Sequence, residues 1–188
     1  AQICAQLQHK GIVPLFDIRI KNDDEIEIHM REISGSTFQT MIQKVHVELQ
    51  QKHLNITTLK NNIQIVLSVC QTLAYAHSMG IIHLDLKPEN ILIGAFDEVF
   101  VIDWGLARPH ETSAIDSRVD NRVSFENFQY IQGGTPFYMP PEQIHNRVSE
   151  QSDIYSLGVI LQECIFGKRL YKKYKESGKS KWYHNVVN

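Results

Sequence analysis

The first third of the chain alternates apolar and polar positions in the way that predicts β-strands. The alternation covers residues 11–20 and returns over residues 25–30, with the acidic turn Asn22-Asp23-Asp24 between the two stretches. Before them, residues 1–9 have helical spacing that we expect to end near Gly11. The polar stretch 32–36 predicts a break, which we interpret as a linker between two parts of the chain.

Helical periodicity governs three later stretches. The first is marked by Phe38, Met41, Ile42 and Val45. The second runs from Thr57 to His77 and should stop at Gly80, and we expect its inner face to be core, with no chemistry for its histidine. That expected face consists of Leu59, Ile63, Val66, Cys70, Leu73 and His77. The third runs from Asp153 to Phe166 and should be buried through Ile154, Leu157, Ile160, Leu161 and Ile165.

Two short apolar stretches, Ile91–Ile93 and Val99–Ile102, flank the sequence GAFDE and predict a β-hairpin. The polar and irregular residues 106–132 that follow are too many for a plain connection. We interpret them as a functional or regulatory loop.

Composition narrows the class of protein. The chain has 188 residues, enough for one domain or one and a half, and its 43% hydrophobic content can form a core. No apolar run approaches the roughly 18 residues that a membrane helix needs. Cys4, Cys70 and Cys164 are too far apart and too few for a disulfide framework, which favours a reducing compartment. The pattern at Ala1 starts within a helix, so we expect a piece of a longer protein.

The last 21 residues, 168–188, are basic: they contain seven Lys or Arg residues and a single acidic one, Glu176. Tyrosines and a tryptophan are interleaved with these charges, an arrangement that could bind nucleic acid or an acidic partner. We favour a solvated segment and expect no specific nucleic acid.

The candidate catalytic residues cluster in HLDLKPENILI, residues 83–93, where Asp85, Lys87 and Asn90 lie within six residues. Asn90 precedes the first strand of the predicted hairpin and Asp103 follows the second, so antiparallel pairing brings both to one end. Oxygen ligands that converge in this way suit Mg²⁺, and the ammonium of Lys87 suits a phosphoryl group in transfer. The four residues together predict phosphoryl-transfer chemistry.

These motifs resemble those of protein kinases. Residues 83–93 resemble the catalytic loop, and IDWGLA at 102–107 resembles the metal-binding Asp-Phe-Gly segment with Trp104 in place of Phe. GGTPFYMPPEQ at 133–143 resembles the end of the activation segment, and SDIYSLGVILQE at 152–163 resembles the buried helix that anchors the catalytic loop. The amino-acid sequences of these motifs are most similar to those of bacterial Ser/Thr kinases.

The resemblance implies an α+β, protein-kinase-like fold: the end of the β-rich N-lobe and most of the helical C-lobe, truncated at both ends. Residues 1–34 would be the last part of the N-lobe and the hinge, and residues 35–188 an incomplete C-lobe. The sequence contains neither the Gly-rich phosphate loop nor the strand with the ATP-binding lysine. We therefore expect the 188-residue chain alone to be inactive or nearly so.

The resemblance also implies roles at matching positions. Asp85 would accept or orient the hydroxyl proton of the substrate, and Lys87 would steady the γ-phosphate of ATP. Asn90 and Asp103 would hold Mg²⁺ and, through it, the nucleotide. Thr135 would contact Asp85 and Lys87 from the loop that receives the substrate.

A second group would bind the adenine: Met30 as gatekeeper, the backbone of Arg31 and Ile33, and Leu92 as the floor. A third group is structural. Asp153 would bond the backbone near His83, and a hydrophobic spine would join the lobes through His83, Trp104, Cys4 and Leu15. The implied cofactors are ATP and Mg²⁺, the implied partners are proteins with Ser or Thr acceptors, and the implied location is the cytoplasm, with any membrane segment outside this region.

Leu84 departs from the family pattern, because many kinases have Arg there. That Arg pairs with a phosphorylated activation loop through a charge-assisted contact, which leucine cannot make. We expect the change to affect regulation and leave the reaction intact.

Two alternatives remain. A pseudokinase or truncated kinase remnant could act as a binding or scaffold module, which the missing glycine loop and lysine would favour in a complete gene product. A small-molecule phosphotransferase of the aminoglycoside type is less favoured, since those enzymes generally lack segments such as 133–143 and 152–163.

Overall fold

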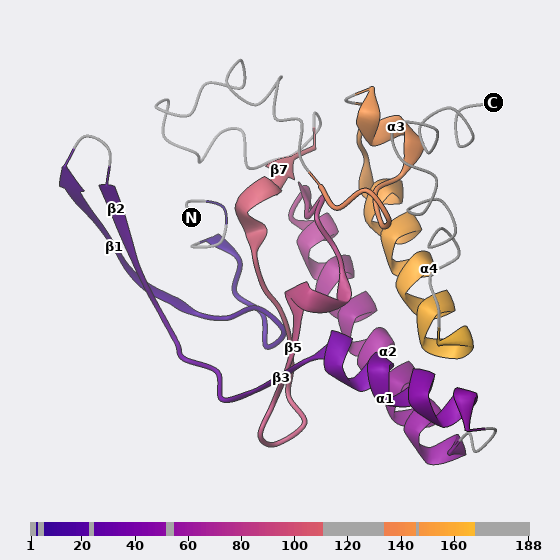
Figure 1. Ribbon diagram of the computed structural model, residues 1–188. Helices are drawn as coiled ribbons and strands as arrows, with labels where there is room; N and C mark the ends of the chain where they lie inside the picture. The colour runs from indigo at the N-terminus through magenta and orange to yellow at the C-terminus, as the bar shows by residue number, and fades with distance from the viewer. Residues whose placement is uncertain are drawn as a thin grey trace.

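The computed structural model describes residue 3 and residues 6–22, 25–51, 55–110, 134–145 and 147–167. A sheet-rich beginning is followed by a mainly helical remainder, as the expected α+β fold requires (Figure 1). The helices are α1 (Phe38–Gln50), α2 (Ile56–Ser78), α3 (Pro141–Ile144) and α4 (Glu150–Phe166). The strands are β1 (Leu15–Asn22), β2 (Glu25–Met30), β3 (Gly35–Thr37), β4 (Ile81–Ile82), β5 (Ile91–Gly94), β6 (Val99–Val101) and β7 (Arg108–Pro109).

Strands β1 and β2 form an antiparallel hairpin, which confirms the strands predicted from alternation. Ile18 lies opposite Ile28 in the register, and Leu15 lies opposite Met30. The first strand begins at Leu15, four residues later than the alternation predicted. In Figure 1 this hairpin lies on the left and extends away from the helices.

A second sheet has the order β3-β5-β6 and contains the predicted hairpin of β5 and β6. The expectation of a polar linker over residues 32–36 was partly wrong, because β3 begins at Gly35 and pairs with β5. A Cβ atom on Gly35 would lie only 1.9 Å from the backbone oxygen of Ile93, so this close pairing depends on glycine. A third pair, β4 with β7, borders the loop that carries Asp85.

The long helix α2 begins where the side chain of Asn55 accepts a hydrogen bond from the N–H of Thr57, at 2.8 Å. It ends before Gly80, whose φ of 72° lies in the left-handed region. The predicted inner face was partly wrong: Ile63 is 42% exposed, whereas Ile65 and Val69 are buried. Apolar side chains occur on more than one side of this helix, so periodicity alone cannot select the buried side.

Helix α4 has a capping box between Ser149 and Ser152 and ends at Gly167, whose φ is 62°. Leu157 and Ile160 are buried as predicted, but the prediction was wrong for Ile154 and Ile165, which are 56% and 38% exposed. Polar residues occupy the buried positions instead: Ser152, Asp153, Ser156 and Glu163. Their hydrogen bonds to the segments around α4 make that face the inner one.

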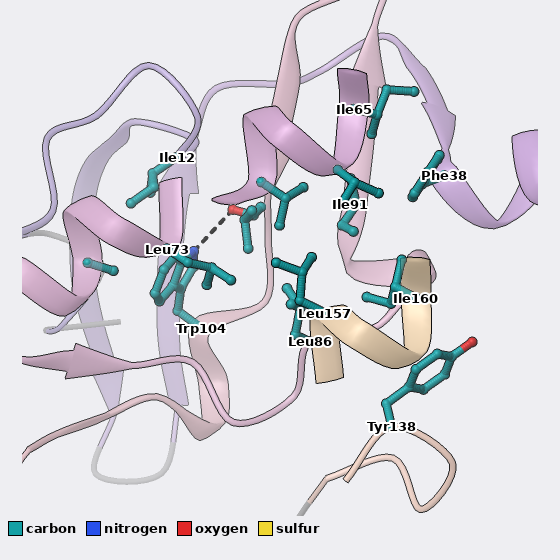
Figure 2. Close-up of a cluster of buried hydrophobic side chains, with 14 of the residues drawn as sticks. Ile12, Phe38, Ile65, Leu73, Leu86, Ile91, Trp104, Tyr138, Leu157 and Ile160 are labelled. Atoms are coloured by element: carbon teal, nitrogen blue, oxygen red, sulfur yellow. Dashed lines mark hydrogen bonds between the residues drawn. The ribbon is translucent and has the colours of Figure 1, made fainter. Parts of the chain in front are cut away.

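The core lies where α1, α2 and α4 meet the β5–β6 hairpin (Figure 2). Phe38, Leu73, Ile91 and Ile160 are at most 1% exposed. The indole of Trp104 is anchored there by a 3.1 Å hydrogen bond from its Nε1 to the backbone oxygen of Val101, drawn dashed in Figure 2. Among the described residues, no helix combines the length and apolar content that spanning a membrane requires.

Candidate active site

Three polar side chains meet between β4 and β5. The Nζ of Lys87 lies 2.6 Å from Oδ2 of Asp85 and 3.0 Å from Oγ1 of Thr135. The hydroxyl of Thr135 in turn donates to Oδ1 of Asp85 at 2.9 Å. Asp85 and Lys87 come from one loop, whereas Thr135 comes from a segment 50 residues further along the chain. The carboxylate is thus held on both oxygens, one by a cation and one by a hydroxyl.

Asn90 fixes the loop from within. Its Nδ2 donates to the backbone oxygen of Asp85 at 2.8 Å and to Oδ2 of Asp85 at 3.2 Å. Asn90 ends the short 3-10 turn Pro88–Asn90, immediately before β5, and is 5% exposed. With both amide hydrogens directed at Asp85, its Oδ1 accepts no hydrogen bond from the described residues and keeps its lone pairs for another ligand.

Asp103 lies at the same end of the hairpin, just after β6. The N–H of Ile102 donates to the backbone oxygen of Asn90 at 2.9 Å, which ties the two strand ends together. Asp103 has a φ of 60°, in the left-handed region, and is exposed. Its Oδ1 accepts a 3.4 Å hydrogen bond from the N–H of Gly105.

Asp153 on α4 clamps the backbone that precedes Asp85. Its Oδ2 accepts from the N–H of His83 and its Oδ1 from the N–H of Leu84, both at 2.9 Å. The bond near His83 was expected, and the structure confirms it. His77 adds a bond from its Nε2 to Oδ2 of Asp153 at 2.8 Å. Sequence reasoning missed this role, because helical spacing assigned His77 to a core stripe.

The ring of His83 links the loop to the strand that carries Asp103. Its Nε2 lies 3.1 Å from the backbone oxygen of Ile102, and its Nδ1 lies 3.3 Å from the N–H of Asp85. These partners select the neutral tautomer with hydrogen on Nε2. Burial lowers the pKa of His83 below its ordinary value, although Asp153 acts in the opposite direction.

The expected spine is present in part. The rings of His83 and Trp104 lie 4.6 Å apart, centroid to centroid, at 59°. Leu15 lines a cavity that Trp104 also lines. Cys4, the fourth expected member, lies outside the described residues.

That cavity has a volume of about 180 Å³ and lies between the β1–β2 hairpin and the end of β6. Its lining is mostly apolar and includes Met30, with Asp103 as its carboxylate. The other expected adenine contacts are not among its lining residues. Arg31 lines a separate cavity of about 440 Å³ and pairs there with Glu98 at 3.7 Å. Ile33 and Leu92 are half-buried.

The chain matches the model of the family described as "Protein kinase domain" over residues 1–187. It is similar to the "Serine/threonine-protein kinase PknD" of Chlamydia caviae, with 38% identity over 186 residues, which is 93% of this chain and 20% of that protein. The protein of the same name from Chlamydia felis is 37% identical over 174 residues, 88% of this chain and 18% of that protein. The one from Chlamydia trachomatis serovar D is 36% identical over 201 residues, 100% of this chain and 21% of that protein. The chain thus spans about a fifth of the length of the curated relatives it matches.

Proposed function

Because the chain belongs to the protein kinase family, we propose that the protein containing it transfers the γ-phosphoryl group of ATP to Ser or Thr hydroxyl groups of other proteins. The observation that carries the proposal is the hydrogen-bonded group of Asp85, Lys87 and Thr135, anchored by Asn90. The name of the relatives, serine/threonine-protein kinase, supports Ser and Thr as acceptors.

In this proposal Asp85 receives the acceptor hydroxyl. A new bond forms between the hydroxyl oxygen and the γ-phosphorus, the bond from that phosphorus to ADP breaks, and the hydroxyl proton passes to Asp85. Lys87 presents its ammonium to the phosphoryl group, where negative charge is spread over the transferring oxygens. Thr135 holds the carboxylate of Asp85 at the segment that would receive the substrate peptide.

The residues present fit a magnesium ion. Asn90 offers its amide oxygen, because the hydrogens on its amide nitrogen are already bonded to Asp85. Asp103 offers an exposed carboxylate at the same end of the hairpin. Mg²⁺ prefers hard oxygen ligands and takes few of them from protein, so that phosphates can complete its shell. When bound, the ion neutralises phosphate charge. We assign Asn90 and Asp103 as its ligands.

The adenine assignments are also part of the proposal. Met30 and the cavity of about 180 Å³ that it lines support a base-binding site, because a mostly apolar cavity with one carboxylate among its lining residues suits a nucleotide base with phosphates beyond it. The backbone of Arg31 and Ile33 and the side chain of Leu92 complete this assignment.

We keep the division into residues 1–34, the end of the N-lobe with the hinge, and residues 35–188, the C-lobe. The separate β1–β2 sheet and the start of β3 at Gly35 support this boundary. The basic segment 168–188 lies outside the described residues. We place the domain in the cytoplasm, which the free thiols of Cys70 and Cys164 support.

The test is phosphoryl transfer from Mg·ATP to a basic protein substrate by the full-length protein and its Asp85→Asn variant. General-base assistance contributes roughly 10²–10⁴-fold, so the variant should lose at least about 100-fold in kcat. Asp97→Asn, the same change in an exposed turn, should keep the wild-type rate. Transfer that survives in Asp85→Asn would remove Asp85 from the mechanism.

If the full-length protein is folded and transfers no phosphate, the scaffold alternative takes the place of the kinase proposal, and partner capture becomes the next experiment. The relatives are named as kinases, which favours activity. The match to a protein kinase domain likewise favours protein acceptors over the small molecules of an aminoglycoside-type phosphotransferase.

A further inference from the structure

Leu84, the residue before Asp85, is held in an unusual backbone conformation. Its φ is 66°, a region that residues with a Cβ seldom adopt, and its side chain is 4% exposed. Both of its backbone polar groups are bonded to side chains from distant elements. Its N–H donates to Oδ1 of Asp153 on α4, and its carbonyl accepts from Nε2 of Gln143 on α3 at 2.9 Å.

Gly134 makes room for the second of these bonds. A Cβ atom on this residue would lie 2.7 Å from Nε2 of Gln143 and 3.4 Å from the carbonyl oxygen of Leu84. Gly134 also has a φ of 127°, which favours glycine. The amide of Gln143 therefore reaches Leu84 past a position that has no side chain.

The bond lies next to the reactive group on both chain segments. Leu84 precedes Asp85, Gly134 precedes Thr135, and Thr135 donates to Asp85 at 2.9 Å. Gln143 thus fastens the two segments together one residue away from the contact between Thr135 and Asp85.

We propose that Gln143 is a positioning residue that fastens residues 134–143 to the catalytic loop through the carbonyl of Leu84. This inference rests on the proposed kinase function. The apolar, buried side chain of Leu84 cannot bind a phosphate, so the neutral amide of Gln143 supplies the attachment that needs no phosphorylation. Segment and loop then stay in register whether or not the chain is phosphorylated.

Two substitutions remove the donor with little change in size. Gln143→Met has no hydrogen to donate, and Gln143→Glu places a carboxylate oxygen against the carbonyl of Leu84. The same changes at Gln64, an exposed position on α2, serve as matched controls. The full-length protein is assayed for kcat, for KM of ATP and of protein substrate, and for amide hydrogen exchange over residues 81–90.

We expect kcat to fall about ten-fold in both Gln143 variants, a change in barrier of about 1.4 kcal/mol, while the KM of ATP stays unchanged. Exchange over residues 81–90 should become faster, and exchange in α2 should not change. The Gln64 variants should match the wild type, and wild-type protein treated with a phosphatase should keep its kcat.

Wild-type kcat and wild-type exchange in Gln143→Met would overturn the inference. So would loss of activity after phosphatase treatment, because the attachment would then depend on phosphate. A folded wild type without any activity refutes the proposed function instead. In that case faster exchange over 81–90 in the variants still supports the attachment, and unchanged exchange overturns it.

Discussion

Replacing Asp153 by Asn tests how the active-site loop is held in place. Asp153 is fully buried, and its carboxylate accepts three hydrogen bonds, from the N–H groups of His83 and Leu84 and from Nε2 of His77. Asn has the same shape but only one acceptor oxygen. In either orientation its NH₂ group must face at least one of these donors.

The least costly orientation keeps the oxygen toward His83 and His77 and turns the NH₂ group toward the N–H of Leu84. This loses one hydrogen bond to a charged acceptor, about 1.5–3 kcal/mol, and leaves a buried donor unpaired. The left-handed backbone conformation of Leu84 costs roughly 1–2 kcal/mol. Of the two hydrogen bonds that hold Leu84 in this conformation, the variant loses the one to residue 153. We expect the free energy of unfolding to fall by about 3 kcal/mol, because a hydrogen bond to a charged acceptor is lost and a buried donor is left unpaired.

Urea denaturation of the full-length protein and of Asp153→Asn, followed by circular dichroism, measures this difference. For a domain of this size the expected change lowers Tm by about 6–12 °C. We also expect a lower kcat, since Asp85 follows directly after the clamped residues. Asp97→Asn is the matched control, because it makes the same change at an exposed position that also has a positive φ, 60°.

A loss of less than about 0.5 kcal/mol in Asp153→Asn, the size of an ordinary surface substitution, would refute this reasoning. It would mean that the loop holds its conformation without the carboxylate. The strain at Leu84 would then have to be balanced by other contacts.

Three further predictions concern stability and reactivity. Burial lowers the pKa of His83 below its ordinary value of 6.5, so as the pH falls the unfolded state takes up the proton first. The free energy of unfolding should therefore be full above that pH and should fall below it by up to about 1.4 kcal/mol per pH unit. Urea denaturation at several pH values should show a shallower dependence of this free energy on pH in His83→Gln than in the wild type, and equal slopes would contradict this. Burial raises the pKa of Cys164 to about 12, so iodoacetamide should label its thiol only as the protein unfolds. Peptide mass mapping measures the labelling, and equal labelling with and without urea would count against the burial of Cys164. Gly35→Ala should destabilise the folded domain by about 1–3 kcal/mol, because its Cβ would lie 1.9 Å from the backbone oxygen of Ile93. The control Gly158→Ala, in open space on α4, should be neutral or stabilising. A wild-type urea midpoint in Gly35→Ala would show that β3 can move.

Local patterns were sufficient for much of the active site. Asp85, Lys87 and Asn90 share one loop, and the β5–β6 hairpin brings Asn90 and Asp103 to the same end. Such contacts join residues that are close in sequence, so strand pairing and loop length determine them. The roles of these residues came from the resemblance to kinases, and they remain proposals.

Residues far apart in the sequence meet only in the packed fold. Thr135 reaches Asp85 across 50 positions and Gln143 reaches Leu84 across 59. The resemblance implied the first of these contacts, but nothing in the sequence indicated the second. No local pattern distinguishes a glutamine that bonds a distant carbonyl from one on the surface.

The sequence by itself determined the β1–β2 and β5–β6 hairpins, the helices α1, α2 and α4, and the group of polar residues in the loop before β5, because these depend on periodicity and short-range geometry. Only the tertiary structure decided which faces of α2 and α4 are buried, and that His77 bonds Asp153. The physical reason is that burial depends on what packs against a helix. A buried polar face, such as that of Asp153 and Glu163 on α4, becomes the inner one only when its hydrogen-bond partners arrive from elsewhere in the chain.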